Sequence, residues 1–199
     1  MALSEQLRRE GYDAGLIAEA LTQSRLRERA ADKFGPFAER MIFTKDGLEQ
    51  ATRLAVGAFH AERFRAAGAE HIVDFGSGIG ADSMAFGALG FQATAIEMDA
   101  DTAEAARLNL RPFPEVEVIN ANGFDVDLAA IGADAIWIDP ARRRDGRRLK
   151  NPEDWSPPLS EAIELASHFD SAGIKIAPGI DYDALSIDDS DDDSEGDQP

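Results

Sequence analysis

The chain has 199 residues, of which 38 are acidic and 20 basic, so its formal net charge is −18, and it contains no cysteine. This composition excludes a disulfide framework, a thiolate nucleophile and a cysteine zinc site, and the charge argues against a general nucleic-acid coat. No apolar run approaches the roughly 20 residues that span a bilayer, and no signal-peptide pattern is present, so we expect a cytoplasmic protein without membrane or metal partners.

Residues 1–68 are predicted to form an N-terminal helical segment. Apolar residues recur there at the three- and four-residue spacing of a helix face: Leu16, Ile17, Ala20, Leu21, Leu26 and Ala30. Gly35-Pro36 interrupts this pattern. A second helix is expected to begin near Asp46 and to run without a break to Gly68, which is a plausible helix C-cap.

From residue 69 to residue 180, short apolar runs alternate with helical stretches. The predicted strands are 71–75, 91–97, 115–119, 133–138 and 172–177, and the predicted helices between them are 81–89, 102–110 and 158–168. This alternation is typical of a parallel sheet covered by helices, an open α/β fold. Ligands of such sheets bind beyond the carboxyl ends of the strands, so the residues that follow each strand are the candidates for a site.

The first strand runs into the bend Asp74-Phe75-Gly76-Ser77-Gly78-Ile79-Gly80. Its glycines let the backbone turn tightly and approach a ligand, with the next helix directed at the site. We therefore take Asp74, Gly76, Ser77, Gly78 and Gly80 as candidate cofactor-binding residues. The same spacing also satisfies the dinucleotide fingerprint, and a tight turn without any ligand is the plainer alternative.

Two further candidates follow the second and third strands. Glu97 ends the second strand, 21 residues after Gly76, where a carboxylate can accept hydrogen bonds from both ribose hydroxyls of an adenosine; Met98 follows it. Asn122, after the third strand, has an amide that suits the exocyclic amine of adenine. The alternatives are a solvated acid at a helix start and a loop-forming Asn-Gly pair.

The fourth strand ends in Asp139-Pro140-Ala141-Arg142-Arg143. The carboxylate of Asp139, held by the rigid Pro140, could accept from an amino group and direct its lone pair at an electrophile. Arg142 and Arg143 could hold a phosphate or carboxylate of the substrate. The alternative is a strand-terminating Asp-Pro turn followed by a solvated loop.

Charge is unevenly distributed at the C-terminal side of the chain. Six of the twenty basic residues fall between Arg142 and Lys150, a run that could bind RNA. Residues 181–199 hold nine acids and no base, so we expect a disordered acidic tail. Without that tail, the remaining residues have a net charge of only −9.

Taken together, these motifs resemble those of the class I S-adenosylmethionine-dependent methyltransferases, and within them the group that carries a THUMP-like domain. The general resemblance depends on the glycine bend and Glu97. The narrower one depends on these segments in order: Lys33-Phe34-Gly35, Phe43-Thr44-x-x-Gly47-Leu48-Glu49-Gln50-Ala51-Thr52, Asp139–Arg143 and Trp155-Ser156-Pro157-Pro158-Leu159. The resemblance implies a Rossmann-like sheet of order 3-2-1-4-5 and S-adenosylmethionine as cofactor.

The resemblance also implies roles for single residues. Gly76 and Gly78 would line the methionine and ribose part of the cofactor, Glu97 would hold the ribose, and Thr44 and Gln50 would lie over it. Asp139 and Pro140 stand where related amino-group methyltransferases have Asp-Pro-Pro followed by an aromatic residue. Here Ala141 and Arg142 replace the second proline and the aromatic residue, so this motif lacks the stacking platform that a flipped base would use.

The resemblance further implies seven strands, with the last two beside the fifth, whereas this chain passes from the fifth strand into the acidic tail. We therefore expect a truncated domain without strands six and seven and without the THUMP-like domain. Its exposed fifth strand would need another polypeptide, or the charge of the tail, to protect its edge.

Three functions are compatible with this sequence. The first is methyl transfer from S-adenosylmethionine, with RNA as the expected acceptor. The second is a truncated module that binds a cofactor or a protein without turnover. The third is an NAD-dependent oxidoreductase, which Asp74 disfavours because dehydrogenase strands run apolar into their first glycine. Methyl transfer needs positioning rather than a strong base, so His60, His71 and His168 are all interpreted as structural.

Overall fold

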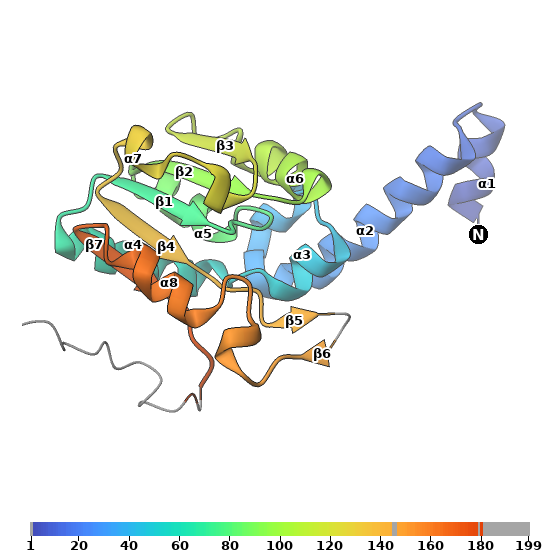
Figure 1. Ribbon diagram of the computed structural model, residues 1–199. Helices are drawn as coiled ribbons and strands as arrows, with labels where there is room; N and C mark the ends of the chain where they lie inside the picture. The colour runs from blue at the N-terminus through green and yellow to red at the C-terminus, as the bar shows by residue number, and fades with distance from the viewer. Residues whose placement is uncertain (1, 145–146, 179, 181–199) are drawn as a thin grey trace, which may run out of the picture.

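A computed structural model of the chain describes residues 2–144, 147–178 and 180. A five-stranded sheet lies at the centre of this part of the chain, with helices on both of its faces (Figure 1). The acidic tail predicted at 181–199 lies outside the described residues. No helix of the described residues combines the length and the apolar character needed to cross a membrane.

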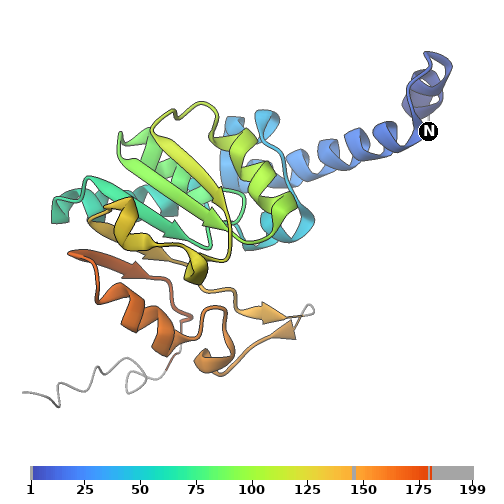
Figure 2. The same ribbon diagram turned by 45° about the horizontal axis from the view of Figure 1, so that its top comes forward.

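All neighbouring strands of the sheet are parallel, in the order β3-β2-β1-β4-β7 (Figure 2). The strands are β1 (His71–Phe75), β2 (Gln92–Glu97), β3 (Val116–Asn120), β4 (Ala135–Ile138) and β7 (Ser171–Ile174). The predicted order 3-2-1-4-5 and the Rossmann-like fold are therefore confirmed. Within the described residues β7 is an edge of the sheet, and the partner polypeptide expected there stays a prediction.

Helices and short helical turns connect the strands. They are α1 (Ala2–Arg9), α2 (Ala14–Phe34), η1 (Gly35–Arg40), α3 (Lys45–Gln50), α4 (Leu54–Ala67), α5 (Ala81–Ala88), α6 (Ala100–Leu110), η2 (Gly123–Asp125), α7 (Leu128–Ile131), η3 (Pro152–Asp154) and α8 (Leu159–Ala166). α4, α5 and α6 pack on one face of the sheet through residues such as Phe64 and Phe86. α7 and α8 pack on the other face, against Val73 and Ile136. The inner strands β1, β2 and β4 are buried on both faces, as continuous apolar runs predict, whereas the edge strands β3 and β7 are only partly buried.

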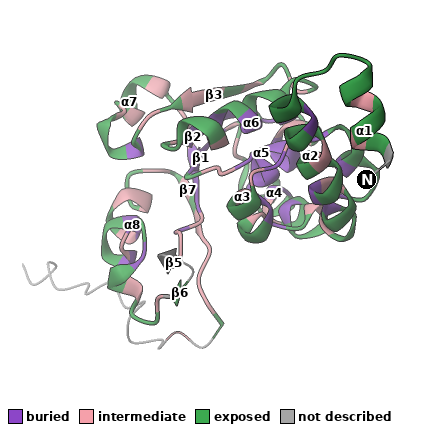
Figure 3. Ribbon diagram, turned by 90° about the vertical axis from the view of Figure 1, so that its right-hand side faces the viewer, coloured by how far each residue is buried: buried purple, intermediate pink, exposed green. Residues whose placement is uncertain are grey.

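The N-terminal helices share a core with the sheet domain. Leu26 and Phe34 of α2 are buried in one cluster with Leu110 of α6. The first half of α2 extends away from the sheet and carries α1 at its end, so its surface is largely exposed (Figure 3). Leu16 and Ile17 were both predicted to lie on the buried face of this helix, but Leu16 is 59% exposed whereas Ile17 is 4% exposed.

The helix predicted from Asp46 to Gly68 is instead two helices, α3 and α4, joined by an extended segment around Thr52. Two tertiary interactions stabilise this break between α3 and α4. The ammonium of Lys33 donates to the carbonyls of Leu48, Glu49 and Ala51, which would otherwise accept from the next turn. The Thr52 hydroxyl donates to the buried carboxylate of Asp82 at 2.6 Å. Propensity favoured a continuous helix, but these tertiary contacts break it.

Candidate active site

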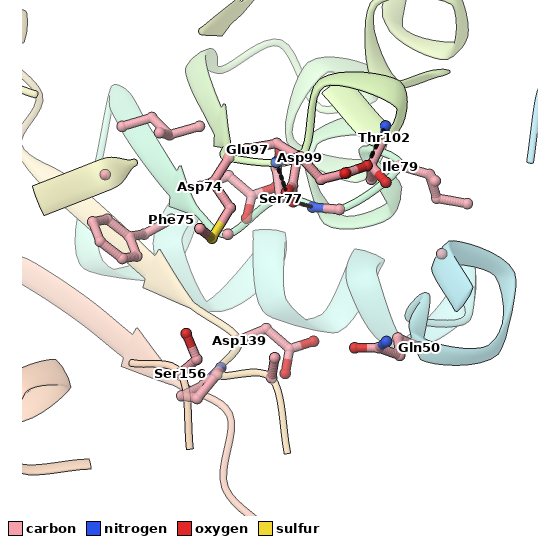
Figure 4. A pocket seen from close by; sticks show the side chains of 18 of the residues that line it. Gln50, Asp74, Phe75, Ser77, Ile79, Glu97, Asp99, Thr102, Asp139 and Ser156 are labelled. Atoms are coloured by element: carbon pink, nitrogen blue, oxygen red, sulfur yellow. Dashed lines mark hydrogen bonds between the residues drawn. The ribbon is translucent and has the colours of Figure 1, made fainter. Parts of the chain in front are cut away.

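The carboxyl ends of the strands open into a cavity of about 1290 Å³. The loops after β1, β2, β3, β4 and β7 all line it, and α3 with the segment that follows covers one side (Figure 4). This is the position in which open parallel sheets bind their ligands. The cavity has two halves that differ in chemistry, and each is named here after the role that the resemblance predicts for it: the cofactor half at the ends of β1, β2 and β3, and the acceptor half at the ends of β4 and β7.

The glycine bend forms the floor of the cofactor half. Gly76, Gly78 and Gly80 all have positive φ, between +57° and +84°, where other residues are strained. A Cβ at Gly78 would meet no atom within 4 Å, and one at Gly76 only the Asp139 carbonyl at 4.0 Å, so a ligand can approach this backbone closely. Gly80 differs, because a Cβ there would lie 2.9 Å from Leu110. It serves packing rather than the cavity surface.

Glu97 faces the glycine bend, as predicted. Its Oε2 accepts from the backbone N–H of Gly78 at 3.0 Å, and its Oε1 accepts from the backbone N–H of Asp99 at 2.8 Å. These bonds fix the carboxylate at the end of β2, across from the bend (Figure 4). Each carboxylate oxygen can still accept a further hydrogen bond from a ligand hydroxyl. The bend and the carboxylate thus form one pocket.

Asp74 lines the cavity at the start of the glycine bend, and its role in cofactor binding stays a prediction. Its side chain is only 1% exposed and accepts a hydrogen bond from the Ser83 hydroxyl. Burial, together with the nearby carboxylate of Asp82, raises the pKa of Asp74 to about 8. The hydroxyl of Ser77, in the bend itself, is buried and has no hydrogen-bond partner among the described residues.

The rim of the cofactor half carries apolar side chains beside the predicted amide. Met98 is 67% exposed and Phe124 is 50% exposed, and both line the cavity. Asn122 lies between them in the chain, and its Oδ1 accepts from the backbone N–H of Phe124 at 3.3 Å. Phe124 packs edge-on against Phe75, which holds its ring in place. The sequence analysis missed Phe124, although its position after the Asn-Gly pair was a usable signal.

Thr44 and Gln50 both line the cavity from α3. The Thr44 hydroxyl caps this short helix by accepting from the backbone N–H of Gly47 at 3.0 Å. Gln50 lies across the cavity from the glycine bend (Figure 4). Lys33 anchors the other end of α3 through its three carbonyl contacts, so the resemblance motif around Lys33 acts by positioning this cover.

Asp139 and Lys175 form an ion pair in the acceptor half. Ile138 and Ile174 are register partners in β4 and β7, so the next residues of both strands leave the sheet side by side. The Nζ of Lys175 donates to Oδ2 of Asp139 at 2.6 Å. Burial raises the pKa of Asp139, and the Lys175 ammonium opposes that shift. Pro140, also predicted as catalytic, is fully buried and fixes the chain beneath Asp139.

Part of the basic run forms a short hairpin beside the cavity, and its Arg147 is exposed to solvent. β5 (Arg143–Arg144) pairs antiparallel with β6 (Arg147–Arg148). Before it, the backbones of Ala141 and Ser156 exchange two hydrogen bonds, which ties this segment to the cavity wall. Arg142 lines the cavity, with its guanidinium 5.9 Å from the ring centre of the buried Trp155. The side chain of Arg143 lies outside the described residues.

The sequence analysis missed a polar network behind the acceptor half. It links Lys175 to Thr52, Thr52 to Asp82, and Asp82 to His60. Its members come from segments as far apart in sequence as residues 52 and 175. The one available signal was Lys175 itself, a charged residue inside the otherwise apolar run Ala172–Ala177.

Comparisons with known proteins agree with this fold. No protein-family model matches the chain. Over 173 residues it is 32% identical to S-adenosylmethionine-dependent methyltransferases, themselves uncharacterised, from two strains of Mycobacterium tuberculosis. The match covers 80% of this chain, which spans only 44% of the length of those relatives.

Solved structures of proteins assigned as methyltransferases have a similar fold. One from Porphyromonas gingivalis W83, assigned as a methyltransferase, superposes with a TM-score of 0.64 at 25% identity, over 82% of this chain and 41% of that one. A second, from Pyrococcus horikoshii and assigned as an RNA methyltransferase, has a TM-score of 0.51 at 17% identity, over 78% and 75% of the two chains. The chain therefore has the Rossmann-like fold of the class I S-adenosylmethionine-dependent methyltransferases and is similar in sequence to such enzymes.

Proposed function

We propose that this chain is the catalytic domain of a methyltransferase that uses S-adenosylmethionine. The observation that carries the proposal is the pairing of Glu97 with the glycine bend: the carboxylate is held 3.0 Å from the Gly78 N–H, above backbone that has no side chain in the way. This is the arrangement that a ribose with two free hydroxyls needs. A tight turn without a ligand would not require an adjoining cavity of about 1290 Å³.

The residues of the cofactor half fit each part of such a nucleoside. Glu97 would accept from the ribose hydroxyls, and the backbone at Gly76 and Gly78 leaves room for the methionine part. Met98 and Phe124 provide exposed apolar surface on the rim that suits the adenine ring. The rim residue Asn122 supplies an amide for the ring nitrogens.

The acceptor half suits the other partner of the reaction. When bound, the cofactor supplies a methyl group activated by its sulfonium. The chain's own task is then to align a nucleophile, because methyl transfer depends on positioning and exclusion of water. Asp139 extends into the cavity from the end of β4 (Figure 4), where its carboxylate can accept from an acceptor N–H. Among the described residues that line the cavity there is no histidine, which is consistent with a reaction that needs positioning rather than a strong base.

We further propose RNA as the acceptor class. Arg142 lies at the cavity wall, and the basic hairpin β5–β6 follows it directly, so a phosphate backbone bound there would lie beside Asp139. The Pyrococcus horikoshii neighbour carries an assignment of the same kind. The narrower kinship with methyltransferases that carry a THUMP-like domain is part of this proposal. It is supported by Lys33 and Ser156, two residues of those motifs that brace the cavity walls.

Calorimetry with S-adenosylhomocysteine tests the cofactor proposal. Wild type should bind, and Glu97→Ala should weaken binding at least tenfold, about 1.4 kcal/mol, because the ribose loses its acceptor. Glu104→Ala, which removes an exposed carboxylate on α6, should bind like wild type. Failure of folded wild type to bind would refute the proposal, whereas NADH binding would favour the oxidoreductase alternative.

Filter binding and radioactive methyl transfer to total RNA test the acceptor proposal. Affinity for RNA should fall steeply between low and high salt, and Arg142→Ala should weaken it, because phosphate contacts release counterions. Methyl incorporation into total protein but not RNA would show that the acceptor is a protein. Cofactor binding without any incorporation would favour the non-catalytic module.

A further inference from the structure

We propose that Lys175 is the positioning residue of the acceptor half, which holds the Asp139 carboxylate in the orientation that receives the acceptor. This inference rests on the proposed methyl-transfer function and names a residue that the fold, rather than any sequence motif, brings to the site. Lys175 would not touch the cofactor. It acts through Asp139.

The side chain of Lys175, which follows β7, bridges Asp139 after β4 and Thr52 before α4. Its Nζ donates to Oδ2 of Asp139 at 2.6 Å and to Oγ1 of Thr52 at 3.0 Å. Its backbone N–H also donates to the Ile138 carbonyl at 2.9 Å, which continues the β4–β7 ladder to the cavity edge. Both side chains of the ion pair are about three-quarters buried, 24% exposed for Lys175 and 22% for Asp139. A pair this enclosed is screened far less than one on the surface.

A network of buried contacts fixes the position of Thr52 and, through it, that of Lys175. The Thr52 hydroxyl accepts from Lys175 and donates to Oδ2 of Asp82. Oδ1 of Asp82 lies 2.8 Å from Nδ1 of His60, and the His60 ring stacks on Trp137 at 4.1 Å. The side chain of Asp82 is 8% exposed and that of His60 is 16% exposed. The hydroxyl of Thr52 therefore has a fixed direction, and with it the ammonium of Lys175.

The arrangement leaves one oxygen of Asp139 for the acceptor. Among the described residues, the Lys175 contact is the one hydrogen bond of this carboxylate, and it occupies Oδ2. Oδ1 can then accept an N–H of an amino group, which directs the nitrogen lone pair toward the methyl carbon. As the N–C bond forms, the C–S bond breaks and its electron pair returns to sulfur. The positive charge passes to the acceptor nitrogen, whose surplus proton leaves to Asp139 or to water.

The charges around Asp139 make Lys175 necessary for this role. The groups that face Asp139 are Asp74 on β1, Asp82 on α5, Arg142 on the following loop and Lys175 after β7. Burial and Asp82 raise the pKa of Asp139, whereas Lys175 and Arg142 lower it. Without Lys175, burial and the Asp82 carboxylate would act on Asp139 with only Arg142, among the described residues, to oppose them. Protonation of Asp139 would then remove the acceptor oxygen.

The test compares Lys175→Met, Lys175→Arg and Arg107→Met in the full chain. Arg107→Met removes an exposed cation on α6 and serves as the control for net charge. Carboxyl-carbon NMR titration should show a higher pKa of Asp139 in Lys175→Met than in wild type, and an unchanged one in Arg107→Met. Turnover with total RNA should fall at least tenfold in Lys175→Met, with its pH profile shifted upward. Lys175→Arg should restore part of the turnover, and S-adenosylhomocysteine affinity should stay within twofold throughout.

The possible failures are distinguishable. An unchanged pKa of Asp139 in folded Lys175→Met overturns the positioning role, and so does a raised pKa with unchanged turnover and pH profile. Loss of S-adenosylhomocysteine affinity in Lys175→Met would mean that the residue supports the whole fold rather than the acceptor half. If wild type itself fails to bind S-adenosylhomocysteine, or binds it but methylates neither RNA nor protein, the proposed function fails first and this inference fails with it.

Discussion

The two halves of the cavity are built in opposite ways. The centre of the cofactor half is made of backbone and of one carboxylate held by backbone N–H groups, and its parts come from the loops after β1, β2 and β3. The acceptor half is made of charged side chains that hold one another, from segments more than 100 residues apart in sequence. The contrast shows how one domain can bind a fixed cofactor with local motifs and leave acceptor recognition to long-range packing.

The prediction with the largest expected effect tests whether the two halves of the cavity act independently. Asp139→Asn should lower turnover about 100-fold, roughly 2.7 kcal/mol, because an amide accepts more weakly than a carboxylate and takes up no proton. Its S-adenosylhomocysteine affinity should stay within twofold of wild type. Steady-state kinetics and calorimetry check this, with the exposed Asp170→Asn as the control. A parallel loss of cofactor affinity would show that the two halves are not independent.

The second prediction distinguishes two glycines of the bend: Gly80, which serves packing, and Gly78, which faces the cavity. Gly80→Ala should lower the free energy of unfolding by about 2 kcal/mol, because φ is +84° and the new methyl would lie 2.9 Å from Leu110. Gly78→Ala should cost only about 1 kcal/mol, since its methyl meets no atom within 4 Å, yet it should weaken S-adenosylhomocysteine binding. Urea unfolding measures the first quantity and calorimetry the second. Equal stability losses would contradict this distinction.

The third prediction concerns Asp74, which lies beneath both halves. Its pKa of about 8 in the folded protein exceeds the ordinary value of 3.8, so the folded state holds its proton more tightly. Stability from this group is complete below pH 4 and falls as pH rises toward 8, by about 1 kcal/mol per pH unit. Asp74→Asn should remove that slope. Urea unfolding of both proteins between pH 5 and 8 checks it, and parallel pH curves would rule it out.

The smallest expected effect concerns the cover over the cofactor half. Lys33→Met removes three hydrogen bonds to α3 carbonyls and should weaken S-adenosylhomocysteine binding about threefold, near 0.7 kcal/mol, because water replaces part of what is lost. Lys150→Met, on the far side of the acceptor half, should not change cofactor affinity. Equal binding by wild type and Lys33→Met would mean that α3 does not depend on this anchor.

Local sequence patterns indicated the parallel α/β sheet, the glycine bend and the place of Glu97, because apolar runs, turn residues and strand ends are features of short segments. The strand order was implied by the family resemblance rather than by these patterns. Sequence also identified Asp139 and Arg142, since both directly follow a strand. Sequence did not predict the break at Thr52 or the exposure of Leu16, because both depend on tertiary packing.

Only the tertiary structure decided what holds Asp139. The register of β4 with β7 places Lys175 beside it, and the break before α4 brings Thr52 and Asp82 within reach. Neither fact can be read from a linear pattern, because a hydrogen bond between residues 123 positions apart leaves no periodic trace in the sequence. Local chemistry specified where a ligand would lie, and long-range packing specified the charge and orientation of the group that meets it.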